Sequence, residues 1–259
     1  PISGEYKTTA DQNAMYLRLV RILEKHGETV QGKFEVAIDS NGDMIYTSSS
    51  EAGRKRFLRD YYGLKSVDEL DDDENKYPSA ITARELFEKA CATGKLTEMK
   101  DSDGNPVTMT DQEALDIINI KYALRLMSFR KYEATTVATQ VSDETVADVL
   151  EHTADLAGVN VEETTIRAYN DSIAFAPIIG YTGKVQEDQL EELKKNRPDY
   201  DVNDIVGTTG IEYTMEQELQ GTKGSKTIYK DSRGRVRETL DETESRAGND
   251  IYLTQIDRK

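Results

Sequence analysis

The chain has 259 residues and a formal net charge of −16, with 37% hydrophobic and 32% charged residues. That length suits one large domain or two small ones, and so polar a composition predicts an extended or lobed shape with much solvated surface. The acidic balance argues against nucleic-acid binding and against adhesion to an anionic membrane, because both need clustered lysine and arginine.

Helical patterns dominate the first half of the chain. Apolar residues at helical spacing predict a helix from Asp11 to His26, which Gly27 would end. A β-hairpin should follow, because apolar residues alternate on both sides of an Asn41-Gly42 turn. The other helices of this half are predicted at Gly53–Tyr62, Thr82–Thr93 and Thr110–Arg130.

The last of these helices carries an apolar stripe, which predicts one buried face. The stripe consists of Leu115, Ile118, Tyr122, Leu126 and Phe129. The acidic run Asp68–Glu74 is expected to be a solvated loop. Cys91 is the only cysteine, and its place in a helical pattern predicts a buried core residue.

Strand-like and helical patterns alternate in the second half. A β-branched run predicts a strand at Thr135–Val141, and Ser142 should cap a helix from Asp143 to Leu156. The buried face of that helix is expected to contain Val146, Val149, Leu150 and Leu156. Later elements are a strand at Val159–Tyr169, a helix at Gln186–Lys195, a hairpin of Lys226–Lys230 with Arg235–Leu240, and a last strand through Ile251, Leu253 and Ile256.

This order, helix-rich first and mixed later, predicts an α+β fold. We expect a helical head lobe in residues 1–132, a mixed sheet-and-helix base in residues 133–250, and a terminal strand in residues 251–259. No apolar run approaches the roughly 20 residues that span a bilayer, and no signal peptide opens the chain. The abrupt start at Pro1 suggests a segment excised from a longer protein.

No residue pattern points to catalysis or to a cofactor. The one Ser-x-x-Lys begins at Ser128, and neither a Ser-x-Asn nor a Lys-Thr/Ser-Gly accompanies it. The two distant histidines, His26 and His152, form no zinc-binding pattern with the single cysteine. The Asp-rich turns at Asp39 and Asp101 lack the glycine and glutamate spacing of a calcium loop. We therefore predict no catalytic residue, no metal and no cofactor.

Short elements in the last part of the chain follow a distinctive order. They are Arg167-Ala168-Tyr169-Asn170, then Gly180-Tyr181-Thr182-Gly183, then Gly207-Thr208-Thr209-Gly210-Ile211-Glu212, and finally Glu216, Leu219, Gly221 and Gly224. This ordered set resembles the pedestal, or dimerisation, region of class B penicillin-binding proteins. The earlier half of the chain resembles the variable head of some Gram-positive members. The resemblance is specific from about Tyr132 to Asp257.

The resemblance implies a non-catalytic scaffold on the extracytoplasmic face of the membrane. The intact parent would be a membrane-anchored D,D-transpeptidase that cross-links peptidoglycan and is acylated by penicillin. Its partners would be its own transpeptidase domain, a SEDS-family glycan polymerase, and division or elongation proteins. The family label would also imply a homodimer, which no sequence feature indicates. The transpeptidase motifs are not among these residues, and Gln255 makes the last strand, Leu253–Asp257, one residue longer than the family pattern.

The resemblance gives a structural or partner-binding role to one set of residues. The set consists of Arg167, Tyr169, Gly180, Tyr181, Gly183, Gly207, Gly210, Glu212, Leu219, Gly221 and Gly224. Arg167 would share a strand face with Thr165 and Tyr169, and Glu212 would lie in the first turn of a helix reaching Leu219. We hypothesise that the guanidinium of Arg167 grips the carboxylate of Glu212 and ties strand to helix.

Two other functions stay open on the residues alone, an acidic cell-surface adhesion module and an enzyme with an unrecognised site. Turns and helix ends would by themselves explain the glycines. Flanking sequence would discriminate, because a transpeptidase brings a membrane helix upstream and three catalytic motifs downstream. An adhesion module would instead bring a signal peptide and a wall anchor.

Overall fold

The computed structural model describes residues 6, 8–73, 76–100, 103–129, 134–163, 166–170, 172–201, 204–230 and 236–252. Within these residues the chain divides into two compact units, unit 1 up to Val161 and unit 2 from Glu162 onward. This division lies later than the predicted boundary at Tyr132. The reason is that α5 (Asp143–Glu151), which we placed in the base, packs against α1 (Thr9–Lys25) of unit 1.

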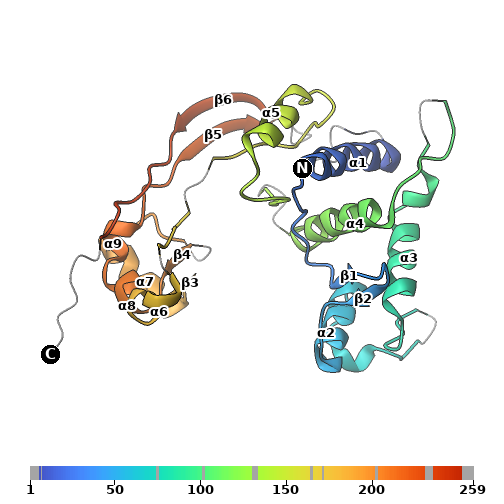
Figure 1. The fold of residues 1–259 in the computed structure, drawn as a ribbon, viewed down its shortest axis with the longest axis horizontal. Coiled ribbons are helices and arrows are strands. Elements are labelled where there is room, and N and C mark those ends of the chain that lie inside the picture. The colour runs from blue at the N-terminus through green and yellow to red at the C-terminus, as the bar shows by residue number, and fades with distance from the viewer. Residues whose placement is uncertain are drawn as a thin grey trace. The chain divides into compact units, whose positions relative to one another are not determined.

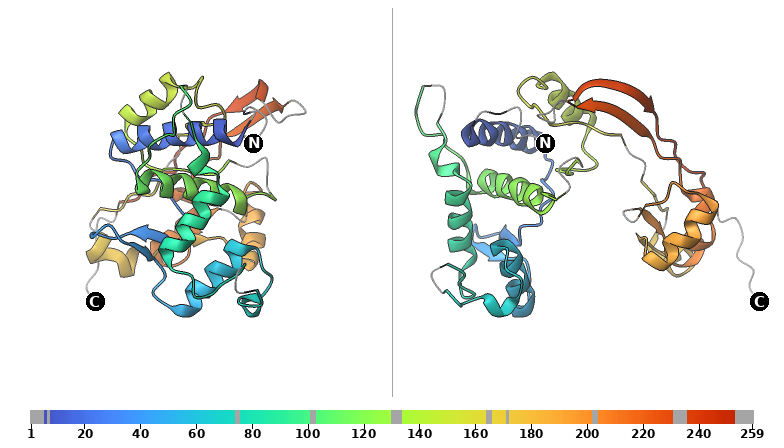
Figure 2. Two further views of the ribbon diagram at one scale, coloured as in Figure 1. Left: turned by 90° about the vertical axis from the view of Figure 1, so that its right-hand side faces the viewer. Right: turned by 180° about the vertical axis from the view of Figure 1, so that it is seen from behind.

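Unit 1 is a helical assembly with one small hairpin. Helices α1 and α4 (Asp111–Leu126) lie side by side, and α3 (Ala83–Thr93) contacts α4 (Figures 1 and 2). The remaining elements of this unit are α2 (Glu51–Tyr62), β1 (Val36–Ile38), β2 (Met44–Tyr46) and the 3-10 helices η2 (Val67–Glu69) and η3 (Leu96–Glu98).

Side-chain caps fix where the helices of unit 1 begin. Thr8, Thr82 and Thr110 each accept a hydrogen bond from the third residue of the helix, whose carboxylate accepts one from the backbone of the cap in return. Ser142 caps α5 as predicted, by accepting a bond from the backbone of Thr145. Each cap contributes about 1 kcal/mol and lets the sequence set the helix start locally.

The apolar core of unit 1 gathers the inner faces of α1, α3 and α4 around an aromatic cluster. Phe34, Phe57 and Tyr122 meet edge to face, with ring centroids 5.4–5.9 Å apart, a favoured aromatic geometry. Cys91 is buried here as predicted, and burial raises the pKa of its thiol to about 11.

Two predicted buried faces extend too far along their helices. Leu126 is the last residue of α4 and is exposed. Phe129 lies in the turn after the helix and is exposed as well, so it does not continue the buried face. In α5, Leu150 is exposed while its neighbour Val149 is buried. The helix also ends at Glu151 rather than at Leu156. Leu156 is nevertheless buried, through the turn that follows the helix.

Two buried asparagines tie the helices of unit 1 together. The Asn13 amide donates to the carbonyl oxygens of Gly94 and Lys95, and its oxygen accepts a bond from Lys121. Burial lowers the pKa of that lysine. Asn119 accepts a bond from the backbone N–H of Phe34 and so joins α4 to the start of the hairpin. Polar groups buried in this way must be hydrogen-bonded, which specifies one arrangement of the helices.

The predicted hairpin is present, and its loop contains Asn41 and Gly42 as expected. Ile38 pairs with Met44, so the residues between them, 39–43, form the loop. The backbone N–H groups of Asp43 and Asn41 donate to the carboxylate of Asp39, which lowers the pKa of that carboxyl. Gly42 supplies the left-handed backbone at φ +87.

Unit 2 combines short helices with two antiparallel pairs of strands. Helices α6, α7 and α8 gather around the pair β3–β4, and β5–β6 forms a longer ribbon (Figure 1). The elements are α6 (Ser172–Ile179), β3 (Thr182–Lys184), α7 (Glu187–Asn196), β4 (Ile205–Gly207), α8 (Gly210–Thr214), α9 (Glu216–Leu219), β5 (Ser225–Lys230) and β6 (Val236–Thr243). The predicted helix α7 and hairpin β5–β6 are confirmed, and the fold class is α+β.

Two predicted strands are absent among the described residues. Segments 134–141 and 159–170 contain no strand, although Gln31 donates one backbone bond to the carbonyl of Val137. Helix α6, which we did not predict, contains Pro177. Ile251 is described and lies outside any strand, while Leu253–Asp257 and residues 258–259 lie outside the described residues. No helix in the described part of the chain is long and apolar enough to cross a membrane.

Candidate functional site

The residues singled out by the family resemblance all lie in unit 2, on neighbouring elements. Arg167 and Tyr169 precede α6, and the Gly180–Gly183 element joins α6 to β3. Gly207 ends β4, and Gly210 begins α8, which also carries Glu212. Leu219 ends α9, and Gly221 and Gly224 follow before β5.

The Arg167 guanidinium lies against two buried carboxylates. Its Nη1 donates to Glu212 and its Nη2 donates to Glu216 Oε2 at 2.8 Å and to Gln220 Oε1 at 3.1 Å. The side chains of Glu212 and Glu216 are only 3% and 6% exposed. The predicted pairing of Arg167 with Glu212 is therefore present, and the cation is shared with a second carboxylate.

Glu216 carries more of this network than the sequence indicated. Besides Arg167, it accepts a bond from the backbone N–H of Gly207 at 2.7 Å and from the hydroxyl of Tyr200 at 3.1 Å. Burial raises the pKa of Tyr200, and the adjacent negative charge of Glu216 raises it further. The spacing of four residues between Glu212 and Glu216 is the signal that could have placed both on one side. Nothing local points to Tyr200.

A break between α8 and α9 separates the two carboxylates along the chain, and both still reach one guanidinium. We expected one helix from Glu212 to Leu219, but α8 ends at Thr214 and α9 begins at Glu216. Glu212 lies in the first turn of α8 and Glu216 in that of α9, where the positive end of a helix favours a carboxylate. Arg167, the backbone N–H of Gly207 and the hydroxyl of Tyr200 together offset the charge of the two acids.

Two glycine elements meet where α6 ends and α8 begins. Gly180 and Gly210 have positive φ angles of +86 and +64. A Cβ on Gly210 would lie 2.6–2.8 Å from the backbone of Ile178, Ile179 and Gly180, and one on Gly180 would overlap the carbonyl of Thr209. Both positions therefore require glycine for backbone conformation and for close approach.

The other glycines differ in how strictly they are required. A Cβ on Gly207 would overlap the backbone of Glu212, and one on Gly221 the carbonyl of Arg246. Gly224 also approaches a backbone oxygen, that of Thr243 at 2.7 Å from the added Cβ, whereas Gly183 would meet only a side-chain hydroxyl at 3.1 Å. Most of these glycines hold backbone segments together.

Arg197 binds the backbone just after the end of α9. Its guanidinium donates to the carbonyl oxygens of Gln220 at 3.0 Å and Gly221 at 2.8 Å. The remaining residues of the predicted set take no part in these contacts. Tyr169 and Tyr181 are 40% and 61% exposed, and Leu219 is half-buried.

The donors and acceptors around Arg167 are directed at one another rather than at a cavity. Within the described residues, no group of three His, Cys, Asp or Glu side chains could hold a metal ion. The arrangement can clamp backbone segments in place. Ser128 lies exposed in the turn after α4, in unit 1, and the Lys131 of its motif is outside the described residues.

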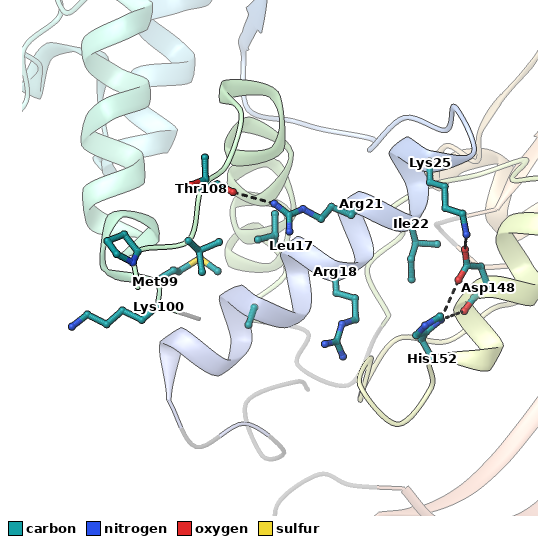
Figure 3. A pocket seen from close by; sticks show the side chains of 13 residues that line it. Leu17, Arg18, Arg21, Ile22, Lys25, Met99, Lys100, Thr108, Asp148 and His152 are labelled. Atoms are coloured by element: carbon teal, nitrogen blue, oxygen red, sulfur yellow. Dashed lines mark hydrogen bonds and ion pairs between the residues drawn. The ribbon is translucent and has the colours of Figure 1, made fainter. Parts of the chain in front are cut away.

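A groove of about 820 Å³ lies in unit 1, beside one face of α1 (Figure 3). At one end of it, Asp148 of α5 accepts bonds from Lys25 Nζ at 2.7 Å, His26 Nε2 at 3.0 Å and His152 Nδ1 at 3.1 Å. His152 Nδ1 also faces the carbonyl of Asp148 at 2.8 Å, so this nitrogen carries the proton. The bonds from Lys25 and His26 lower the pKa of Asp148 to about 2.

Replacing Asp148 by asparagine is expected to destabilise unit 1 at neutral pH and to lose this effect in acid. The folded-state pKa lies below the usual value of about 3.9, so the carboxylate contributes its stability above about pH 4. That contribution disappears as the pH falls toward 2. Urea melts of both proteins at pH 6, 4, 3 and 2.5 would measure the shrinking difference.

The exposed pair Arg18–Asp155 supplies the control for this experiment. Asp155 is 56% exposed in its ion pair, so Asp155→Asn should have little effect at any of these pH values. A gap between wild type and Asp148→Asn that stays constant down to pH 2.5 would contradict the assigned ion pairs.

Comparison with known proteins gives a consistent family signal. A family model described as the penicillin-binding protein dimerisation domain matches residues 2–253. Peptidoglycan D,D-transpeptidase MrdA of Escherichia coli strain K12 is 30% identical over 126 residues, which are 48% of this chain and 20% of that protein. Penicillin-binding protein 2A of Bacillus subtilis strain 168 is 29% identical over 222 residues, 82% of this chain and 29% of that protein.

A solved structure also aligns with the chain. Penicillin-binding protein 2B of Streptococcus pneumoniae strain 5204 aligns with 93% of this chain and 34% of its own, at a TM-score of 0.39 and 20% identity. The chain thus spans between 20% and 34% of the lengths of these three proteins.

Proposed function

The chain belongs to the penicillin-binding protein dimerisation domain family, and from that premise we propose that it is a non-catalytic scaffold of a peptidoglycan D,D-transpeptidase. Relatives in Acinetobacter baumannii and Escherichia coli are among those that carry the transpeptidase name. In the intact protein, the chain would position the catalytic domain, which lies outside these residues. No observation on the described residues favours the alternative of an adhesion module.

The observation that carries this proposal is the Arg167 network, which consists of Arg167, Glu212, Glu216, Gln220, Tyr200 and the backbone N–H of Gly207. Its two carboxylates are buried and bound by the chain's own guanidinium, backbone N–H and tyrosine hydroxyl. An active site needs groups that are free to meet a substrate, whereas these groups are already paired with one another. A rigid base built in this way supports a role in holding other parts in position.

The partners and location follow from the same proposal. The scaffold would lie on the extracytoplasmic face of a membrane-anchored parent, next to its own transpeptidase domain. It would contact a SEDS-family glycosyltransferase and proteins of division or elongation, and the family label suggests a homodimer. The set from Arg167 to Gly224 would keep the contact surface in shape rather than touch the partner through each residue.

Fluorescent penicillin tests the scaffold proposal in two arms. The chain alone is expected to form no covalent adduct, because a nucleophilic serine needs an activating base and an oxyanion hole that its described residues do not assemble. In the intact protein, Arg167→Ala is expected to keep acylation by the drug and to lose wall cross-linking in cells. Gel fluorescence would measure the first effect and muropeptide analysis the second.

Full-length penicillin-binding protein 2A of Bacillus subtilis would serve as a labelling reference for this assay. An adduct on the chain alone that disappears in Ser128→Ala would contradict the scaffold role and would revive the Ser-x-x-Lys motif. Normal cross-linking by the Arg167→Ala protein would show that the contacts of Arg167 are not needed for the scaffold role.

A further inference from the structure

One face of α1 presents positive charge along the groove of unit 1 (Figure 3). Arg18, Arg21 and Lys25 are spaced three and four residues apart on this helix and line the groove together. Among the described residues that line it, Asp148 is the one carboxylate. A cationic groove is unexpected in a chain whose formal net charge is −16.

Two of the three ion pairs of the groove expose the cation and largely bury the carboxylate. Arg21 is 51% exposed while its partner Glu113 is 7% exposed, and Lys25 is 66% exposed while Asp148 is 11% exposed. The third pair, Arg18–Asp155, is about half exposed on both sides at 49% and 56%. Such an exposed pair is weak and can exchange for another carboxylate. The groove therefore exposes N–H donors to solvent, while the carboxylates of Glu113 and Asp148 are largely buried.

From this geometry we propose that the groove between α1, α5 and the segments 99–100 and 106–108 docks an extended acidic segment of a partner protein. The three cations span about 10 Å along α1, at a rise of about 1.5 Å per residue. Side chains on one face of an extended peptide repeat about every 6–7 Å. The span of about 10 Å lies between one and two of these repeats. The long side chains of Arg18 and Lys25 can take up the difference, so carboxylates on one face of the peptide can meet both of them, with Arg21 between.

Small apolar surfaces beside the cations favour a peptide over a phosphate polymer. Ala14 and Pro106 are exposed in the groove and Val107 is half-buried. An acidic peptide can place an apolar side chain on them between its carboxylates, which a polyphosphate or a teichoic-acid chain cannot do. This proposal concerns unit 1 and is independent of the scaffold role proposed for the Arg167 network.

Fluorescence anisotropy with the whole 259-residue chain tests this proposal. The probe is a fluorescein-labelled peptide of four Glu-Val repeats, with four Lys-Val repeats as its reverse-charge counterpart. The groove variant is Arg18→Glu/Lys25→Gln, which leaves the bond between Arg21 and buried Glu113 intact. The matched control is Arg56→Glu/Lys55→Gln on α2, which makes the same change in net charge outside the groove lining.

The Glu-Val peptide is expected to bind the wild type and the α2 control alike, and to bind the groove variant at least tenfold more weakly. Its affinity should also fall as salt is raised. Because the whole chain is acidic, general electrostatics would favour the Lys-Val peptide instead. Absence of Glu-Val binding, or equal binding by the groove variant, would overturn the proposal. Short-chain polyphosphate that binds the groove more tightly than the peptide would overturn it too, in favour of a polyanion as occupant.

Circular dichroism of both double variants checks that they are folded. Weaker peptide binding by a folded variant can then be attributed to the lost contact and not to unfolding. Arg18 and Lys25 are exposed, and Asp148 keeps both histidines as donors in the groove variant. A groove variant that fails to fold would be replaced by Arg18→Glu alone, for which a several-fold weaker affinity is expected. Unchanged affinity in that folded variant would equally overturn the proposal.

Discussion

Replacing Arg167 by alanine is expected to lower the free energy of unfolding of unit 2 by about 3–5 kcal/mol. The change removes one cation and leaves the buried carboxylates of Glu212 and Glu216 facing each other without it. Glu216 keeps the bonds from Gly207 and Tyr200, whereas the Glu212 carboxylate loses the bond from Arg167 and has no other side-chain donor among the described residues. Stranding buried charge is among the few mechanisms that produce losses of this size.

Because Arg167 is shared by two carboxylates, removing the arginine and removing Glu212 should not cost the same free energy of unfolding. Glu212→Gln removes one carboxylate but leaves Arg167 bound to Glu216, so its expected cost is nearer 1 kcal/mol. The double variant should lose less than the sum of the two single variants, because the neutral amide at position 212 no longer strands a charge. Arg59→Ala is the control, since Arg59 pairs with the half-exposed Asp60 and should cost at most about 1 kcal/mol.

Denaturant melts and hydrogen exchange together would measure these losses. Exchange of the Gly207 amide reports directly on unit 2, because that N–H donates to Glu216. Equal and additive losses below about 1 kcal/mol for Arg167→Ala and Glu212→Gln would contradict a buried, shared cation.

Gly210→Ala is expected to destabilise unit 2 by about 2–5 kcal/mol, from two separate effects. A side chain at φ +64 costs roughly 1–2 kcal/mol of backbone strain. The added Cβ also lies within 2.8 Å of three backbone atoms of the α6 C-terminus, which cannot yield as a flexible side chain would. Overpacking of this kind adds about 1–3 kcal/mol.

Two matched glycines separate these effects. Gly63 has φ +74 and open space around its Cβ position, so Gly63→Ala should show the backbone strain alone. Gly183→Ala has ordinary φ and meets only the Thr208 hydroxyl at 3.1 Å, so it should be nearly neutral. Thermal melts of the three variants would rank them. A Gly210→Ala protein no less stable than Gly63→Ala would mean that α6 and α8 do not approach so closely.

Local signals made most of the helices predictable. Threonine and serine caps with an acid three residues on fix helix starts without any knowledge of the rest of the fold. The two absent strands show the limit of such signals. The runs at Thr135–Val141 and Val159–Tyr169 have suitable composition, but a strand also needs a neighbour to pair with, and the described residues of these runs form no ladder.

The candidate site was partly predictable for a related reason. The pairing of Arg167 with Glu212 was expected from charge and from the order of the short elements. Its sharing with Glu216 has a local signal only in the four-residue spacing of the two acids, and the bond from Tyr200 depends on a distant segment that returns to the same place. Contacts that require tertiary approach leave little trace in the periodicity of one segment.

The sparse apolar core of unit 2 has a thermodynamic consequence. Its described core cluster consists of Val185, Tyr200 and Val206, with Leu190 and Leu193 packed against it, whereas polar and backbone contacts join the other elements. Exposing apolar surface raises the heat capacity on unfolding, and exposing polar surface lowers it. Unfolding of unit 2 would therefore change the heat capacity less per residue than unfolding of unit 1, and its stability curve would be the shallower of the two. The stability of unit 2 would then vary less with temperature than that of unit 1.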